Sequence, residues 1–281
     1  MKEDYYVLIK NKLVDNEIYG RVKDISKERN TVVTYYDTGR LLSEAGSRYG
    51  EGVIKEYAKK LSIEVGRKYD TSTLKRMRQF YNLFPFEKGA ALPHQLSWSH
   101  FQELLPIKDI YERDYYINIA INQKLSHKAL RLKIKSKEYY RLPLETRNKL
   151  ITNNKLELKD AIKNPIIIKT DQDILNERLL QKVILEDISS FLEELGPGFT
   201  FIKNEYKIQI GDRFNYIDLL LFNYIYNCFV VVELKVNEYK KEYAGQIEAY
   251  TNYIDTNLKR INHNPTLGIV LVKKNDGYYI E

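Results

Sequence analysis

Apolar positions in the first half of the chain recur at the spacing of α-helices. The pattern predicts a helix that starts at residues 5–9 and further helices over 20–45, 52–65, 97–105 and 111–121. Glycines punctuate the end of the second of these. The first half is therefore expected to be a helical domain.

Two more helices in this half begin at capping residues and are strongly basic. Asp70 precedes the segment 74–81 and Ser126 precedes 128–135; both residue types are preferred N-caps because their side chains accept a backbone N–H. A helix, a short turn and a capped basic helix form the outline of a helix-turn-helix, whose second helix enters the major groove of DNA. Many helical bundles share that outline. The basic candidates for nucleic-acid contact are Lys75, Arg76, Arg78, Lys128, Arg131, Lys133 and Lys135.

The pattern changes type in the second half. After turn signals within residues 142–170, amphipathic helices are expected over 174–195 and 240–258. Short strand-like runs, some continuously apolar, predict a sheet covered on both faces. We therefore expect two domains, 1–160 and 170–281. The strands are expected at 199–203, 206–210, 215–222, 228–234 and 266–272.

Charge is divided unevenly between these halves. The 281 residues carry a net charge of +7, and the first 150 alone carry +10. A basic domain of this kind can meet a polyanion such as nucleic acid, but many basic domains bind nothing, so charge leaves both interpretations open.

Composition excludes several classes of protein. The single cysteine, Cys228, rules out an intramolecular disulfide framework and a cysteine-rich zinc site. The longest apolar run is far shorter than the roughly 20 residues that a membrane helix needs. The charged N-terminus lacks the apolar region of a secretory signal. We expect a cytosolic protein with no membrane association.

Two carboxylates stand at predicted strands. Asp218 lies within the run 216–221, and Glu233 follows the apolar run 229–232. A buried carboxylate is costly unless it is paired or binds a cation, and two on neighbouring strands repel unless a divalent metal lies between them. Lys235 is two residues from Glu233 and shares its face of the strand. The set suits a metal-activated water that attacks a phosphodiester, with the ammonium stabilising charge.

On the helix that follows, Gln246 and Tyr250 are four residues apart and share a face. The side chains on this face are expected to point toward the same site. The plainer interpretation puts the acids at the surface, since Glu-Leu-Lys is common at strand ends and an aspartate can begin a turn. The placement of Gln246 and Tyr250 favours the site.

The order Asp218, Glu233-x-Lys235, Gln246-x3-Tyr250 resembles the PD-(D/E)xK nuclease superfamily, in its branch with a Q-x3-Y helix. In that superfamily the acids of the motif belong to a metal site. The resemblance therefore implies the same class of chemistry as the residues themselves.

The match is closer to one family. Residues 216–220, 231–235 and 242–246, together with 74–81 and 96–100, are similar to the bacterial YhcG-type family. The resemblance covers nearly the whole chain. It implies a helical, helix-turn-helix-like domain followed by a restriction-endonuclease-like α/β domain with a mixed sheet. The family usually continues past the last predicted strand, so a C-terminally truncated nuclease domain is expected.

This resemblance implies an endonuclease that uses Mg²⁺ (or Mn²⁺) and cuts duplex or branched DNA bound by the first domain. Homo-oligomerisation is left open. The implied roles are metal binding by Asp218, Glu233 and the Leu234 carbonyl, positioning of the water by Lys235, and support of the site by Gln246 and Tyr250.

One position departs from the family. The superfamily's first metal-site acid usually comes from the helix before the sheet, and here Gln181 falls in its place, with Glu177 or Glu186 as the substitute. Two alternatives therefore stay open. One is a non-catalytic DNA-binding protein on a degenerate nuclease scaffold, which Gln181 favours. The other is a protein-interaction module whose basic half binds an acidic protein.

Overall fold

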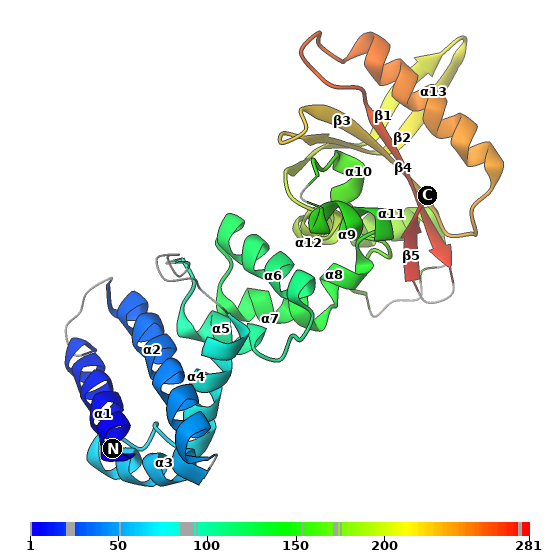
Figure 1. The fold of residues 1–281 in the computed structure, drawn as a ribbon. Helices are drawn as coiled ribbons and strands as arrows, with labels where there is room; N and C mark the ends of the chain where they lie inside the picture. Colours follow the sequence, from blue (N-terminus) through cyan, green and yellow to red (C-terminus); the bar gives the residue numbers. More distant parts are fainter. Residues whose placement is uncertain are drawn as a thin grey trace. The chain divides into compact units, whose positions relative to one another are not determined.

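The computed structural model divides the chain into two compact units, Met1–Ser136 and Lys137–Glu281 (Figure 1). Each is described by itself. The residues that the structure describes are 2–20, 26–50, 52–84, 93, 95–152, 154–170, 174, 176–274 and 277–281.

The first unit is helical, as its periodicity predicts. The second expected helix extends beyond its predicted end and stops at Gly50, whose φ of 82° suits glycine; positions 21–25 of that expected helix lie outside the described residues. The helices are α1 (Lys2–Tyr19), α2 (Ser26–Tyr49), α3 (Gly52–Glu64), α4 (Thr71–Leu83), α5 (Trp98–Leu104), α6 (Ile110–Asn122) and α7 (His127–Lys135).

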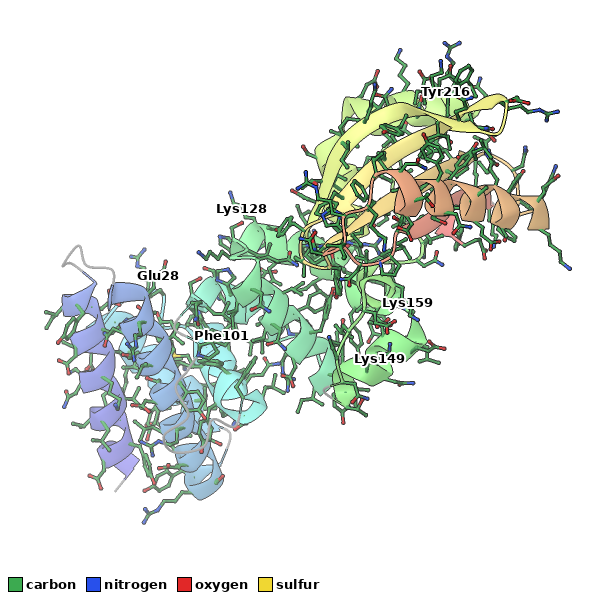
Figure 2. All side chains as sticks on the ribbon, turned by 90° about the horizontal axis from the view of Figure 1, so that it is seen from above. Glu28, Phe101, Lys128, Lys149, Lys159 and Tyr216 are labelled. Carbon is green, nitrogen blue, oxygen red and sulfur yellow. The ribbon has the colours of Figure 1, made fainter. Side chains whose placement is uncertain are left out.

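Close packing places the basic helix α4 against α2. A Cβ atom on Gly39 of α2 would lie 2.1 Å from the carbonyl oxygen of Met77 in α4, so only glycine permits this approach. Both expected caps are confirmed: Asp70 accepts the Thr73 N–H at 2.7 Å, and Ser126 caps α7. Figure 2 shows Phe101 buried among the helices of this unit and Lys128 on their outer side.

The second unit is built on one five-stranded sheet in the order β1-β2-β3-β4-β5. The pairs β1–β2, β2–β3 and β4–β5 are antiparallel and β3–β4 is parallel, which confirms the mixed sheet. The elements are α8 (Glu138–Arg141), α9 (Leu144–Ile151), α10 (Leu158–Ala161), α11 (Glu177–Glu186), α12 (Ile188–Leu195), β1 (Phe199–Ile210), β2 (Arg213–Asn223), β3 (Cys228–Lys235), α13 (Lys241–Asn257), β4 (Leu267–Lys274) and β5 (Gly277–Ile280).

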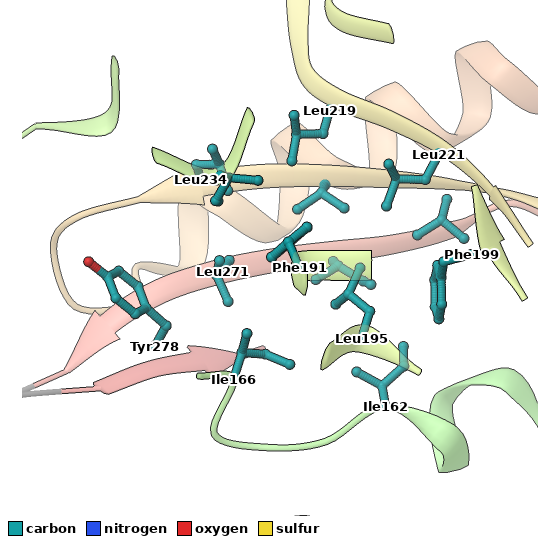
Figure 3. Close-up of a cluster of buried hydrophobic side chains, with 14 of the residues drawn as sticks. Ile162, Ile166, Phe191, Leu195, Phe199, Leu219, Leu221, Leu234, Leu271 and Tyr278 are labelled. Atoms are coloured by element: carbon teal, nitrogen blue, oxygen red, sulfur yellow. The ribbon is translucent and has the colours of Figure 1, made fainter. Parts of the chain in front are cut away.

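Helices cover both faces of this sheet. Helices α11 and α12 lie on one face and α13 on the other (Figure 1). The larger core, between the sheet and α11–α12, includes Phe191, Leu195, Leu219, Leu234 and Leu271 (Figure 3). Burial of both faces explains why the central strands read as continuous apolar runs.

Three local expectations were wrong. The helix expected over 174–195 is two helices, because Asp187 leaves helical geometry and its side chain accepts the Ser190 N–H at 3.2 Å. The strands expected at 199–203 and 206–210 are the single strand β1, which contains a bulge after Phe201. Strand β5 and helices α8–α10 were not expected.

The second compact unit begins at Lys137, earlier in the chain than the boundary expected from turn signals and the change of pattern. Residues Leu158, Ile162 and Ile166 belong to the core beside the sheet, and Ile166 forms a bridge to Tyr278. The segment between residues 137 and 170 therefore packs with the second unit. Within the described residues, no helix is long and apolar enough to cross a membrane.

Candidate active site

The register of β2 and β3 places Asp218 near Glu233. Leu219 pairs with Val232, so one further step along this antiparallel ladder brings Asp218 opposite Glu233. The Asp218 carboxylate reaches across to β3, where its Oδ2 accepts the backbone N–H of Leu234 at 2.8 Å.

Alternation along β3 separates core residues from site residues. Val230, Val232 and Leu234 face the larger core beside α11 and α12. Glu233 and Lys235 therefore face α13, and both are buried, with exposed fractions of 3% and 8%. A strand inside a covered sheet thus buries an acid and a base side by side.

Helix α13 completes the environment of Glu233. The Gln246 Nε2 atom donates to Glu233 Oε1 at 2.7 Å and to the Tyr250 hydroxyl at 3.0 Å. The Lys235 ammonium donates to the same Oε1 at 2.9 Å. The structure therefore brings together the five side chains expected at the site, Asp218, Glu233, Lys235, Gln246 and Tyr250.

The second oxygen of the Glu233 carboxylate differs from the first. Glu233 Oε2 is buried and has no hydrogen bond from the part of the chain that the structure describes. An unpaired buried carboxylate oxygen is costly, and the cost falls if a proton or a cation reaches it.

The pKa values of the two carboxyl groups also indicate a site that favours a proton or a cation. Burial, and then the charge of Asp218, raise the pKa of Glu233 to about 7. Burial also raises the pKa of Asp218. Burial alone would lower the pKa of Lys235, but its hydrogen bond and charge interaction with Glu233 outweigh this and raise it. Two acids that resist ionisation together suit a site that takes up positive charge.

These groups fit a hard divalent cation. Two carboxylates and the nearby Leu234 carbonyl are oxygen donors of the kind that Mg²⁺ and Mn²⁺ bind. Among the described residues, no three His, Cys, Asp or Glu side chains are grouped to hold a metal.

The structure distinguishes Gln181, which replaces the helix acid, from the two candidate substitutes on the same helix. Gln181 donates from Nε2 to the backbone carbonyl of Asp218 at 3.0 Å, so it braces the strand. Glu177, one turn earlier, has Oε2 at 3.6 Å from the Lys235 ammonium. Glu186 pairs with Lys182 at 3.9 Å on the exposed side of α11. Glu177 is therefore the acid of this helix that reaches the site.

Sequence reasoning missed two residues at the site. Tyr243 places its ring under the Lys235 ammonium, 5.3 Å from the ring centroid; its spacing of three from Gln246 and seven from Tyr250 was a usable signal. Glu205 lies opposite Asp218, between the pairs Asn204↔Leu219 and Tyr206↔Ile217. It has a φ of 46°, and only the strand register reveals its position.

The basic candidates of the first unit lie on two separate helices. On α4, Lys75 and Arg76 are exposed and Arg78 is half-buried. Leu74, Met77 and Phe80 form the buried face of the same helix, so the basic residues occupy its outer side. This arrangement leaves α4 able to meet a phosphate backbone.

On α7, Arg131 is already engaged by an acid of the same unit. Arg131 makes a bidentate contact with Glu103, at 3.0 Å from Nε and 2.6 Å from Nη2. Lys128 and Lys135 are exposed, and Lys133 is half-buried. The charge of α7 is therefore partly balanced within the protein.

Comparison with known proteins matches both units. Residues 158–281 match the family model described as the YhcG PDDEXK nuclease domain, and residues 17–141 match the DUF1016 N-terminal domain. The chain belongs to the YhcG-type family. Its second half is thus a nuclease domain of the PDDEXK type.

A curated relative supports this assignment. The protein named "Putative nuclease YhcG" of Escherichia coli (strain K12) is 24% identical over 282 residues, which covers 85% of this chain and 75% of the relative. No solved structure matches the chain.

Proposed function

We propose that this protein is an endonuclease that hydrolyses DNA phosphodiesters with Mg²⁺ or Mn²⁺, and that its first unit binds the DNA. The observation that carries the proposal is the buried Oε2 of Glu233, which has no hydrogen-bond partner among the described residues, beside the Asp218 carboxylate and with the Lys235 ammonium on the same face. Nuclease-family membership supports the reaction class.

Each residue has a role that its position supports. Asp218, Glu233 and the Leu234 carbonyl would hold the cation, which when bound would lower the pKa of a water and polarise the phosphate. Lys235 positions that water and stabilises negative charge. Gln246 fixes the Glu233 carboxylate and is itself fixed by Tyr250. DNA would be held through Arg76, Arg78 and the exposed lysines of α7.

Cleavage of supercoiled plasmid tests the proposal. The parent should nick it with Mg²⁺ or Mn²⁺ but not with EDTA, and Glu233→Ala and Asp218→Ala should each abolish nicking while leaving DNA binding intact. Mn²⁺ soaked into a crystal should give anomalous density between the two carboxylates. A parent that binds Mn²⁺ there and cuts no nucleic acid would refute the nuclease proposal.

A second candidate is favoured by one observation. Gln181 occupies the position of the helix acid and is tied to the Asp218 backbone, and Glu177, the acid of this helix that reaches the site, contacts Lys235. A non-catalytic DNA-binding protein on a nuclease scaffold would keep this architecture. It would bind plasmid with steep salt dependence and leave it uncut with either cation.

A further inference from the structure

The described residues around the Lys235 ammonium include two carboxylates and an aromatic ring. The Nζ of Lys235 lies 2.9 Å from Glu233 Oε1, 3.6 Å from Glu177 Oε2 and 5.3 Å from the ring centroid of Tyr243. An ammonium within about 6 Å of a ring centroid is attracted to the π face. The Lys235 side chain is 10% exposed, so water screens this attraction weakly.

Helix α13 positions the Tyr243 ring at the site. Tyr243 lies three residues before Gln246 and seven before Tyr250, so the three side chains share the face that looks over Glu233 and Lys235. The ring of Tyr239 meets that of Tyr243 edge-on, with centroids 6.1 Å apart and an interplanar angle of 84°. Tyr243 is therefore oriented by a second ring.

We propose that the ring face of Tyr243 is a positioning element for Lys235, which keeps the ammonium aimed at the reacting phosphate when Glu233 engages a divalent cation. In the arrangement seen, Glu233 Oε1 accepts from Lys235. A cation at the same carboxylate competes for that electron density and weakens the hydrogen bond. The aromatic face binds no hard cation of this kind and so retains its hold on the ammonium.

This inference rests on the nuclease activity proposed above, but its geometry can be tested without it. A proton held over an aromatic face resonates upfield. In the full-length protein, the ε-methylene protons of Lys235 should be shifted upfield in the parent and in Tyr243→Phe, and should lose the shift in Tyr243→Leu. Tyr253→Leu is the matched control, because Tyr253 packs from the same helix against the Ile208 and Ile217 cluster; it should keep the shift. An unshifted parent resonance overturns the inference whether or not DNA is cut.

Kinetics then test the role. With Mn²⁺, Tyr243→Leu should lower kcat by roughly 3- to 30-fold, the range that a cation–π contact allows, with unchanged DNA affinity measured in Ca²⁺. Tyr243→Phe should restore the rate, because the ring and not the hydroxyl is required. In a Lys235→Met background, Tyr243→Leu should cost nothing further, since the two residues act as a pair.

The outcomes distinguish the positioning role of Tyr243 from the proposed nuclease function. Additive losses from Tyr243→Leu and Lys235→Met would make Tyr243 a packing residue and overturn the inference. Loss of rate in Tyr243→Phe equal to that in Tyr243→Leu would do the same, by assigning the role to the hydroxyl. A parent that cuts no DNA would refute the proposed function, while the proton shift still decides whether the ring holds Lys235.

Discussion

The side-chain amide of Gln246 lies 2.7 Å from Oε1 of Glu233, so helix α13 fixes a carboxylate that strand β3 presents. The same amide donates to Tyr250 at 3.0 Å. Oε1 is held by Gln246 and by Lys235, whereas Oε2 has no hydrogen-bond partner in the described part of the chain, so the proposed cation would bind at Oε2. If Glu233 binds a cation as proposed, Gln246 would therefore affect how tightly that cation is held through its hydrogen bond to the carboxylate.

The first prediction follows from this contact. Gln246→Ala should weaken Mn²⁺ binding by roughly 10- to 100-fold, the usual effect of removing a partner of a metal-ligating side chain. Calorimetric titration with Mn²⁺ measures it. Gln209→Ala, which removes an exposed glutamine on β1, is the control and should bind as the parent does. Equal affinity in Gln246→Ala and the parent would contradict the assignment of Glu233 as a ligand.

The second prediction concerns pH. Burial, with the nearby charge of Asp218, raises the pKa of Glu233 to about 7 from a usual value of 4.5. Between these two values the folded protein binds more protons than the unfolded chain, so stability must fall as pH rises through this window and level off above it. Urea unfolding in EDTA at pH 5 to 8 should show this fall in the parent.

The matched variant for that experiment is Glu233→Gln, which keeps the size of the side chain and removes its charge. The stability of this variant relative to the parent should grow with pH up to about 7. Mg²⁺ should stabilise the parent more at pH 8 than at pH 5.5, because a cation binds the ionised carboxylate. An offset between parent and variant that is constant across the pH range would contradict the raised pKa.

The sequence predicted the positions of the site residues where their spacing matches the period of a strand or a helix. Asp218 stands opposite Glu233 because β2 and β3 pair as an antiparallel ladder, and Lys235 shares the face of Glu233 because side chains alternate along a strand. The four-residue spacing of Gln246 and Tyr250 likewise predicted a shared helical face. Such local periodicities do not depend on the rest of the fold.

Other features could not be read from the chain. Asp187 ends one helix and caps the next within the segment 174–195. The apolar positions keep their helical spacing across this break, so the pattern does not reveal it. Helices α8 and α10 and strand β5 have four residues each, too few to show a period. Glu177 reaches Lys235 from another element, and such distant pairings depend on the tertiary fold.

The third prediction addresses the basic helix α4. Arg76→Ala combined with Arg78→Ala should weaken DNA binding and lower the slope of log K against log salt by about two, since each phosphate contact contributes about one. The rate of cutting on saturating DNA should change little. Arg40→Ala is the control, because Arg40 is paired with Glu44 at 2.7 Å. Unaltered binding in the double variant would move the DNA site, with α7 as the next candidate.

The fourth prediction concerns a buried ionic network in the second unit. The Lys163 ammonium is 3.6 Å from Glu138 and 3.5 Å from Glu194, and it donates to the Glu193 carbonyl at 3.1 Å. Lys163→Ala should cost about 3 kcal/mol, because buried carboxylates lose a partner. Lys182→Ala, at an exposed i,i+4 pair, should cost less than about 0.5 kcal/mol. Urea unfolding compares the two, and similar costs would show that the network does not stabilise the fold.

The last prediction tests Lys235, which distinguishes a metal site used for catalysis from a structural one. Lys235→Met keeps the packing of the stem and removes the ammonium. Turnover should fall by roughly 10²–10³, the loss seen when a stabiliser of transition-state charge is removed. DNA affinity in Ca²⁺ should stay near the parent value, because one phosphate contact among many is lost. Mn²⁺ should bind at least as tightly as in the parent, because a positive charge 2.9 Å from Glu233 is gone. If Lys235→Met cuts DNA as fast as the parent, the ammonium only balances the charge of Glu233, and the Glu-x-Lys spacing carries no catalytic meaning in this chain.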